Sequence, residues 1–391
     1  MSRVYLDNSA TTPVLPEVFE AMRPYFAERF GNASSIHHHG QETRAAVEGA
    51  RESVAALVGC RAAEIVFTSG GTESDNLAIF GTVRAGDHVI TSTIEHHAVL
   101  KTCKHLEMNG CEITYVAVDE NGRVDPDDVR RALRANTKLI SIILANNETG
   151  VLQPIAEIGR IADEADVYFH TDAVQAAGKV PIDVSLLGCD LLTISGHKIH
   201  GPQGIGALYV RKGTKIEPLL HGGRHERSRR AGTENVPGIV GLGKAAELAR
   251  CGLNEGEVNR VAALRDRLER GILNQIEATH INGLAASRVP NIANIRFDGI
   301  EGESLVIALD LKGLAVSTGA ACSSGSIEPS HVLLAMGLKT SEARGSVRFS
   351  LGKQNTEEDL DFALTLVPET VARLRELSPV WGKVASSTLT R

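Results

Sequence analysis

The stretch LLTISGHK, residues 191–198, is a short apolar run that leads directly into a glycine, a histidine and a lysine. Further apolar runs of this kind lie between residues 64 and 210, and the segments between them show helical spacing. Several runs are almost continuously apolar, which is typical of strands covered by helices on both faces. This alternation predicts an α/β fold with a mostly parallel sheet. The expected strands are Glu64–Thr68, His88–Thr91, Ile113–Val118, Leu139–Leu144, Val167–Thr171, Leu191–Ser195 and Ile205–Val210.

The pattern changes after Cys251. Helical spacing returns at 258–268 and 360–374, and strand-like runs lie at Asn294–Phe297 and Ser346–Ser350. This predicts a second, smaller α/β domain, and a chain of 391 residues is long enough for both. The expected organisation is an N-terminal segment (1–15) packing with the small domain, a large domain (16–255), a small C-terminal domain (256–380) and a tail (381–391).

Composition and charge exclude several classes of protein. The net charge of -7, from 48 acidic and 41 basic residues, argues against stable binding of nucleic acid through bulk charge. No stretch approaches the roughly 18 consecutive apolar residues of a membrane span, and the N-terminus shows no signal-peptide pattern. The six cysteines form no CxxC pair or zinc-ligand spacing, as expected for reduced thiols. We therefore expect a cytoplasmic protein that does not associate with membranes.

The strand EIVFT is followed by Ser69–Ser74, SGGTES, and then by an apolar helix. The two glycines let the backbone approach a ligand, and a helix N-terminus favours an anion such as phosphate. The same residues also fit an ordinary turn with a helix cap, so both interpretations stay open here. A dinucleotide site is not favoured, because Gly201, Gly204 and Gly206 precede a strand instead of opening a helix.

An acid and a lysine follow two other expected strands. Asp172 follows Val167–Thr171, and Lys198 follows Leu191–Ser195. Alone, the acid fits a helix cap and the lysine a solvated surface group. Functional residues of open α/β sheets gather beyond the carboxyl ends of the strands. Together with the glycine turn, these residues supply a Schiff-base lysine, an acid for a pyridinium nitrogen and a phosphate cup, which indicates pyridoxal phosphate.

The chain closely resembles the cysteine desulfurases of the NifS and IscS type. The resemblance runs nearly end to end and implies a fold-type-I pyridoxal-phosphate transferase. It also implies a homodimer with the active site between the two domains, partly completed by the neighbouring subunit. The motifs that carry it are, in order, YLDNSATTP, GNASS, TSGGTESDN, IEHHAV, NNETG, HTDAVQ, SGHKIHGPQGIG, RRAGTEN, STGAACSSGS, EPSHVL and SVRFSLG.

The resemblance assigns the cofactor residues motif by motif. Lys198 is similar to the lysine that holds the cofactor covalently, and His96 to the histidine stacked on its ring. Asp172 and Gln175 match the residues that hold the pyridine nitrogen and the ring oxygen. The implied phosphate ligands are Gly71, Thr72, Ser195 and His197, with Thr233 reaching the phosphate of the partner subunit.

The resemblance also assigns residues to the substrate and to the sulfur. Asn147 and Arg348 resemble the residues that orient cofactor and substrate, and an arginine suits a carboxylate because it offers two parallel hydrogen bonds. Cys322 in GAACSSG, within the small domain, matches the cysteine that accepts sulfur as a persulfide. The implied catalytic residues are thus Cys322, Lys198 and His96.

The implied reaction converts L-cysteine to L-alanine and transfers sulfur through the persulfide to a scaffold or carrier protein. Iron–sulfur cluster assembly, including nitrogenase maturation, is the expected destination, with tRNA thio-modification as another. The rivals are a related pyridoxal-phosphate lyase or aminotransferase, such as a selenocysteine lyase, and a non-catalytic sulfur-assembly scaffold. The Cys322 loop argues against the lyase, which needs no such nucleophile, and the intact cofactor residues argue against the scaffold.

Other polar clusters receive weaker interpretations. The histidines at 37–39, 197 and 200 lack cysteine or acidic neighbours in sequence, so no intrinsic metal is expected. Cys322 alone could transiently ligate a nascent iron–sulfur cluster through its persulfide. The basic stretch 224–230 fits either a solvated loop or a border of the partner's phosphate site. Ser9 stands where the family often has asparagine, and Ala33 where it often has proline; neither is expected to touch the chemistry.

Overall fold

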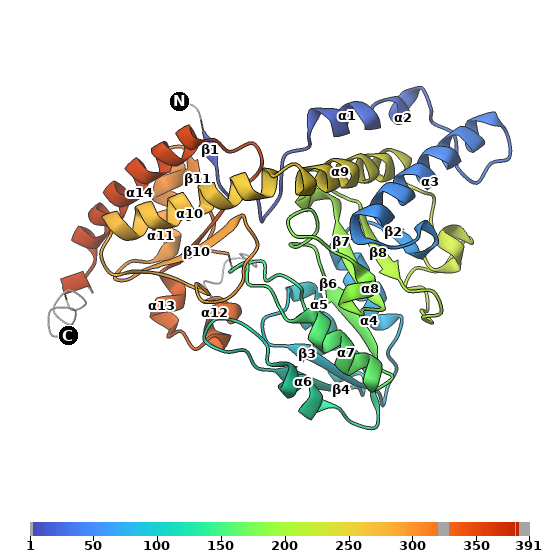
Figure 1. Cartoon of the computed structure of the whole chain (residues 1–391), viewed down its shortest axis with the longest axis horizontal. Coiled ribbons are helices and arrows are strands. Elements are labelled where there is room, and N and C mark those ends of the chain that lie inside the picture. The colour runs from blue at the N-terminus through green and yellow to red at the C-terminus, as the bar shows by residue number, and fades with distance from the viewer. Residues whose placement is uncertain (1–2, 320–327, 380, 383–391) are drawn as a thin grey trace.

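The computed structural model describes residues 3–319, 328–379 and 381–382, which form two lobes joined through a pair of long helices (Figure 1). The joining helices are α9 (Val236–Asn254) and α10 (Glu257–Gln275), and the chain passes from the larger lobe to the smaller one between them. The turn that separates them contains Gly256 at φ 81°, a backbone conformation that favours glycine.

A seven-stranded sheet forms the centre of the larger lobe, in the order β2-β8-β7-β6-β5-β3-β4. Only β8 runs antiparallel to its neighbours, so the expected mostly parallel α/β fold is confirmed. All seven expected strands are present, with ends that differ by at most three residues. They are β2 (Ile65–Thr68), β3 (His88–Ser92), β4 (Glu112–Val116), β5 (Thr137–Ser141), β6 (Tyr168–Asp172), β7 (Leu191–Ser195) and β8 (Gly206–Val210).

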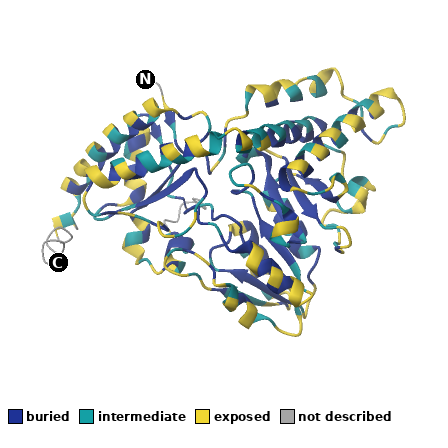
Figure 2. Cartoon of the chain, viewed as in Figure 1, coloured by how far each residue is buried: buried dark blue, intermediate teal, exposed yellow. Residues whose placement is uncertain are grey.

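Helices cover both faces of this sheet, which leaves most of the strands buried, while the edge strand β4 is largely half-buried (Figure 2). The apolar stripe of α3 (His38–Val58) is buried through Val47, Val54 and Leu57. Helix α3 packs closely on α9, where a Cβ at Gly243 would lie 2.6 Å from the Ala50 Cα. The other helices of this lobe are α1 (Pro16–Met22), α2 (Pro24–Ala27), α4 (Gly71–Phe80), α5 (His97–Met108), α6 (Pro126–Ala132), α7 (Ile155–Glu164) and α8 (Val184–Leu187).

The smaller lobe has its own core around a three-stranded antiparallel sheet, ordered β12-β10-β9. The expected strands correspond to β10 (Ile292–Phe297) and β12 (Ser346–Ser350), while β9 (Thr279–Ile281) is too short to show a period in the sequence. The helices here are α10, α11 (Gly302–Leu311), α12 (His331–Ala335), α13 (Thr340–Arg344) and α14 (Glu357–Leu377). None of the described helices is both long and apolar enough to cross a membrane.

The N-terminal segment connects the two lobes. Its strand β1 (Val4–Tyr5) pairs in parallel with β11 (Leu314–Ala315), and Val4 and Leu6 join the core of the smaller lobe. Beyond this pairing the chain crosses to the larger lobe, where Thr12 N donates to the His197 carbonyl oxygen at 2.9 Å. This crossing brings residues 7–12 against the carboxyl ends of the central strands.

Candidate functional site

A cavity of about 910 Å³ lies where the carboxyl ends of the central strands face the smaller lobe. Most of the residues that the sequence assigns to a site line it together, although they come from segments as far apart as α4 and β12. These are Gly71, Thr72, His96, Asn147, Asp172, Gln175, Ser195, His197, Lys198 and Arg348.

Lys198 lies in a short 3-10 turn (Gly196–Lys198) immediately after β7. Its Nζ donates to the carbonyl oxygens of Ser9 and Ala10, the second at 2.8 Å. Burial and the nearby Arg348 guanidinium lower the pKa of Lys198 to about 8, although Asp7 and Asp172 act in the opposite direction. A larger share of the side chain is therefore neutral and nucleophilic near neutral pH than for a solvated lysine.

Asp172 ends β6 and is buried, with one oxygen accepting from the Val174 N–H at 2.9 Å. Burial raises the pKa of Asp172, while that hydrogen bond and Lys198 lower it. Asp75 of α4 lies beside it, and burial together with the Asp172 carboxylate holds the pKa of Asp75 well above its usual range. Two buried carboxyls this close cannot both ionise readily. We assign the charge to Asp172, because it accepts the Val174 N–H and the positive charge of Lys198 favours its ionised form.

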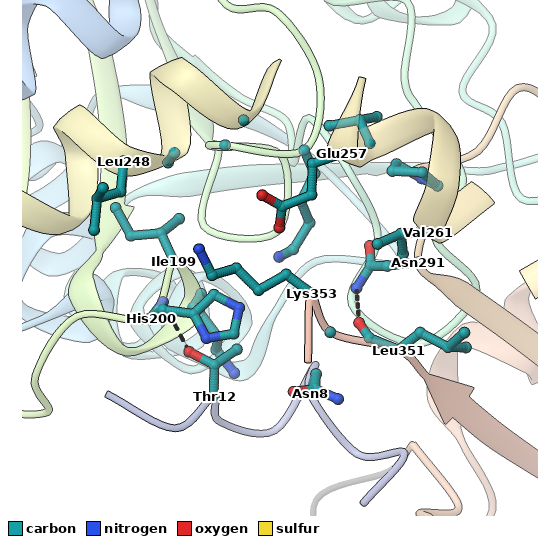
Figure 3. A pocket seen from close by; sticks show the side chains of 18 of the residues that line it. Asn8, Thr12, Ile199, His200, Leu248, Glu257, Val261, Asn291, Leu351 and Lys353 are labelled. Carbon is teal, nitrogen blue, oxygen red and sulfur yellow. Dashed lines mark hydrogen bonds between the residues drawn. The ribbon is translucent and has the colours of Figure 1, made fainter. Parts of the chain in front are cut away.

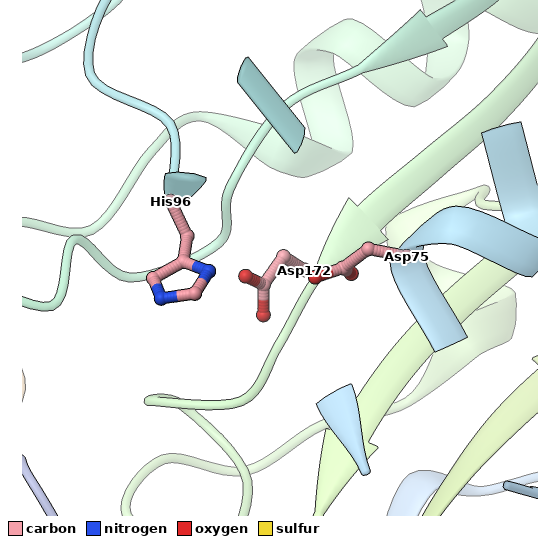
Figure 4. Close-up of side chains that lie close together, drawn as sticks. All are labelled: Asp75, His96 and Asp172. Carbon is pink, nitrogen blue, oxygen red and sulfur yellow. The ribbon is translucent and has the colours of Figure 1, made fainter. Parts of the chain in front are cut away.

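His96 completes a cluster with Asp75 and Asp172, in which one ligand-type atom of each lies within 4.8 Å of the others (Figure 4). His96 is the N-cap of α5, where its Nδ1 accepts from the Ala98 N–H at 3.1 Å, so the proton of the neutral ring lies on Nε2. Burial and Lys198 lower the pKa of His96 to about 4. The ring is therefore neutral at physiological pH and presents an uncharged aromatic face to the cavity, which suits stacking on another ring.

Anion-binding groups lie at the other end of the cavity. Gly71 and Thr72 form the first turn of α4, whose free N–H groups favour a phosphate, and Ser195 ends β7 beside them. A Cβ at residue 71 would lie 2.9 Å from the Val174 Cγ2, so a larger residue there would require that side chain to shift. His197 has its Nδ1 3.2 Å from the Thr11 hydroxyl oxygen.

Ser9 lines this cavity and contacts two of its residues through its backbone. Any residue at position 9 could make these backbone contacts, so the expectation that the serine itself leaves the chemistry unchanged stays a prediction. Its carbonyl oxygen accepts from Lys198 Nζ and, at 2.9 Å, from Gln175 Nε2. The crossing of the N-terminal segment between the lobes causes this contact, which no local pattern near residue 9 indicates. Ala33, the other departure, does not line the cavity.

Arg348 projects from β12 toward the cavity and is almost fully buried. Its Nη1 donates to the Asn147 carbonyl oxygen at 2.8 Å and its Nη2 to Asp7 Oδ1 at 2.8 Å. Among the described residues, its Nε has no hydrogen-bond partner. A buried guanidinium with an unused donor beside the cavity suits recognition of a small carboxylate.

Two assigned residues are not among those that line the cavity. Thr233 is exposed on the loop before α9. Cys322 lies outside the described residues, but Thr318, Gly319 and Glu328, on either side of that gap, line the cavity. In the basic stretch, Arg230 is not a solvated group, because it donates to both oxygens of Glu73 in the first turn of α4.

The side chains present fit pyridoxal phosphate. Among the described residues that line the cavity, Ser9 Oγ, Asp75 Oδ1 and Arg348 Nε are buried polar atoms without hydrogen-bond partners. Buried polar atoms normally have partners, so unpaired ones around one cavity point to a polar ligand. Sequence reasoning missed Asp75, although it stands three residues after Thr72 on a helix and hence on the same face.

Comparison with known proteins agrees with this geometry. The aminotransferase class-V family model matches residues 4–362. The chain is 54% identical over 380 residues to the cysteine desulfurase IscS of Dictyoglomus turgidum, covering 96% of each chain. It is 57% identical over 384 residues to the cysteine desulfurase IscS of Methanosarcina thermophila, covering 97% of this chain and 95% of the relative.

Solved structures agree with the fold. A NifS-like protein superposes with a TM-score of 0.88 at 40% identity, covering 95% of this chain and 100% of that one. The structure described as SspA in complex with cysteine superposes with a TM-score of 0.79 at 38% identity, covering 90% and 100%.

Proposed function

The chain belongs to the aminotransferase class-V family and is a cysteine desulfurase that uses pyridoxal phosphate, and from this premise we propose the roles of its site residues. The observation that carries the proposal is that Lys198, Asp172, His96 and Arg348 line one cavity. When bound, the cofactor supplies an electron sink for charge that develops at the substrate Cα.

We propose that Lys198 holds the cofactor and that Asp172 and Gln175 hold its ring nitrogen and ring oxygen. His96 stacks on the ring, and Gly71, Thr72, Ser195 and His197 hold the phosphate. The low pKa of Lys198, about 8, supports its second role as the base that takes the proton from the substrate Cα.

Asn147 and Arg348 hold the substrate in this proposal. The carbonyl oxygen of Asn147 fixes the guanidinium from one side and Asp7 fixes it from the other. A rotationally fixed arginine orients the cysteine carboxylate and thereby aims the Cα–H bond at Lys198.

Cys322 takes the sulfur. The five cysteines that the structure describes support this choice by their surroundings, because none of them lines the cavity. Burial raises the pKa of the Cys60, Cys103 and Cys189 thiols to about 12, which disfavours the thiolate that attack on sulfur requires. L-Cysteine and the Cys322 thiolate would then give L-alanine and a persulfide on Cys322.

The assembly we propose is a homodimer with a sulfur acceptor. The exposed aromatic rings of Phe19, Phe26 and Phe30, on and just after α1 and α2, support a protein interface on the larger lobe. Thr233 would reach the partner's phosphate site. The acceptor is a scaffold or carrier protein for iron–sulfur assembly.

Two further proposals concern location and domains. The five free thiols among the described residues support a cytoplasmic location. The separate hydrophobic cores of the two lobes support a division near residue 255 into a large and a small domain.

The experiment that tests this function measures alanine and sulfide released from L-cysteine, with and without a thiol reductant. A desulfurase that holds sulfur as a persulfide forms alanine in a single burst without reductant and turns over when reductant is added. Continuous sulfide release without reductant, retained in Cys322→Ala, would instead indicate a lyase that needs no cysteine nucleophile.

A further inference from the structure

Lys179 lies behind the cavity and reaches one of its residues from the far side. It stands four residues after Gln175, in the turns that follow β6, and its Nζ lies 3.1 Å from Gln175 Oε1. The side chain lines a second, smaller cavity of about 80 Å³, which Glu257 and Lys353 also enter (Figure 3). Lys179 is thus separated from the main cavity by the Gln175 amide.

Two contacts determine how the Gln175 amide is turned. Lys179 Nζ carries donor hydrogens whether or not it is protonated, and it lies 3.1 Å from the amide oxygen, which can only accept. A carbonyl oxygen can only accept, so the amide nitrogen must face Ser9, whose carbonyl oxygen lies 2.9 Å from Nε2. An amide nitrogen carries two hydrogens, and Gln175 lines the main cavity, so the second hydrogen is available there.

Lys179 occupies an unfavourable place for a positive charge. Burial, Lys198 and Arg348 lower the pKa of its side chain to about 7. Among the described residues, no ion pair involves its Nζ, and the hydrogen bond to Gln175 is the one that the side chain makes. An apolar side chain of similar length would avoid this desolvation cost. The contact with the Gln175 amide is thus the specific interaction that this half-buried lysine makes.

We propose that Lys179 is a positioning residue that holds the Gln175 amide with its NH2 group toward the main cavity, where it donates to the cofactor's ring oxygen. The inference rests on the proposed assignment of Gln175 to that oxygen. A donor there stabilises negative charge on the ring oxygen and so disfavours the protonated, cationic form of the neighbouring lysine–cofactor linkage.

The test is a pH titration of the visible absorbance band of the holoenzyme, which reports protonation of that linkage without requiring turnover. Gln175→Ala should move the midpoint to higher pH by about 0.5 to 1 unit, which corresponds to the free energy of one lost hydrogen bond. Lys179→Met should move it in the same direction. The double variant should have the midpoint of Gln175→Ala alone, because Lys179 acts through the amide. Lys353→Met, which removes a charge from the same small cavity without touching Gln175, should leave the midpoint unchanged.

The outcomes distinguish the positioning role of Lys179 from the assignment of Gln175 to the cofactor's ring oxygen. An unmoved midpoint in Gln175→Ala would reject the assignment of Gln175 itself. A shift in Gln175→Ala without one in Lys179→Met, or additive shifts in the double variant, would overturn the positioning role. If Lys179→Met does not fold, Lys179→Gln replaces it in the test. The introduced glutamine amide can pair with either end of the Gln175 amide, so the midpoint of this variant should fall between those of wild type and Gln175→Ala. A midpoint equal to that of wild type would overturn the proposal.

Discussion

The Nη2 of Arg348 donates to Asp7 Oδ1 at 2.8 Å, which joins the strand β12 of the smaller lobe to the N-terminal segment at the wall of the cavity. The guanidinium is thereby fixed before any substrate arrives. A fixed arginine loses little further freedom when it binds a carboxylate, so more of the binding energy remains for orientation of the substrate.

Arg348→Lys should impair cysteine binding more than cofactor binding, because lysine keeps the charge but not the planar array of donors. The lost charge-assisted hydrogen bond should cost about 1.5 to 3 kcal/mol, or roughly ten- to a hundredfold in kcat/KM. The visible cofactor band should remain. Steady-state kinetics check this, with Arg296→Lys, which lies on the neighbouring strand β10 outside the cavity, as the matched control. An unchanged kcat/KM would shift attention to Arg344, which also lines the cavity.

Lys198 should carry the cofactor covalently. Borohydride reduction of the yellow holoenzyme should leave a phosphopyridoxyl mass on the peptide that contains Lys198, and peptide mass spectrometry locates it. Lys212 and Lys215, on the loop after β8, are internal controls that should stay unmodified. An adduct on either of them would reject the assignment.

Uptake of the cofactor by the apoprotein should depend on pH with a midpoint near the Lys198 pKa of about 8. Only the neutral amine attacks the cofactor aldehyde, so the rate should rise with pH and level off above that value, well below the roughly 10.4 of an ordinary lysine. Asp172 raises the Lys198 pKa, so Asp172→Asn should lower the midpoint. Stopped-flow absorbance measures both, and a higher midpoint in Asp172→Asn would contradict the electrostatic account.

Cys322→Ala should keep the cofactor and still bind cysteine, as the change in the visible spectrum reports, but should lose persulfide formation. Only the nucleophile has been removed. Cys60→Ala and Cys251→Ala are matched controls, because both thiols are described as free and lie away from the cavity. Trapping of persulfide with an alkylating reagent, followed by mass spectrometry, should find it on Cys322 in wild type and in both controls, and nowhere in Cys322→Ala.

Thr233 should complete the site of the partner subunit, and mixing of two inactive variants tests this. In a heterodimer of Lys198→Ala and Thr233→Ala chains, one site would combine the intact lysine of one chain with the intact threonine of the other, because a two-fold interface is reciprocal. About half of the wild-type activity per heterodimer should return. A mixture of Lys198→Ala and Asp172→Asn chains should stay inactive, since both residues serve one subunit's site. Absence of complementation by Thr233→Ala would mean that Thr233 acts within its own subunit.

The local pattern of the sequence was sufficient for the seven central strands of the larger lobe and for the polar residues at the ends of three of them. A strand covered on both faces is rich in apolar residues, so all seven central strands were legible, and their carboxyl ends placed Thr72, Asp172 and Lys198 near one another. The short strands β1, β9 and β11 were not legible, because two or three residues carry no period.

Only the tertiary structure decided which distant segments complete the site. Asp7 and Ser9 reach Arg348 and Lys198 because the N-terminal segment pairs with β11 and then crosses between the lobes. The orientation of the Gln175 amide likewise depends on Ser9 on one side and Lys179 on the other. Sequence periodicity indicates which face of a helix or strand is buried. Which distant segment covers that face depends on long-range packing, and the residues near either segment do not show it.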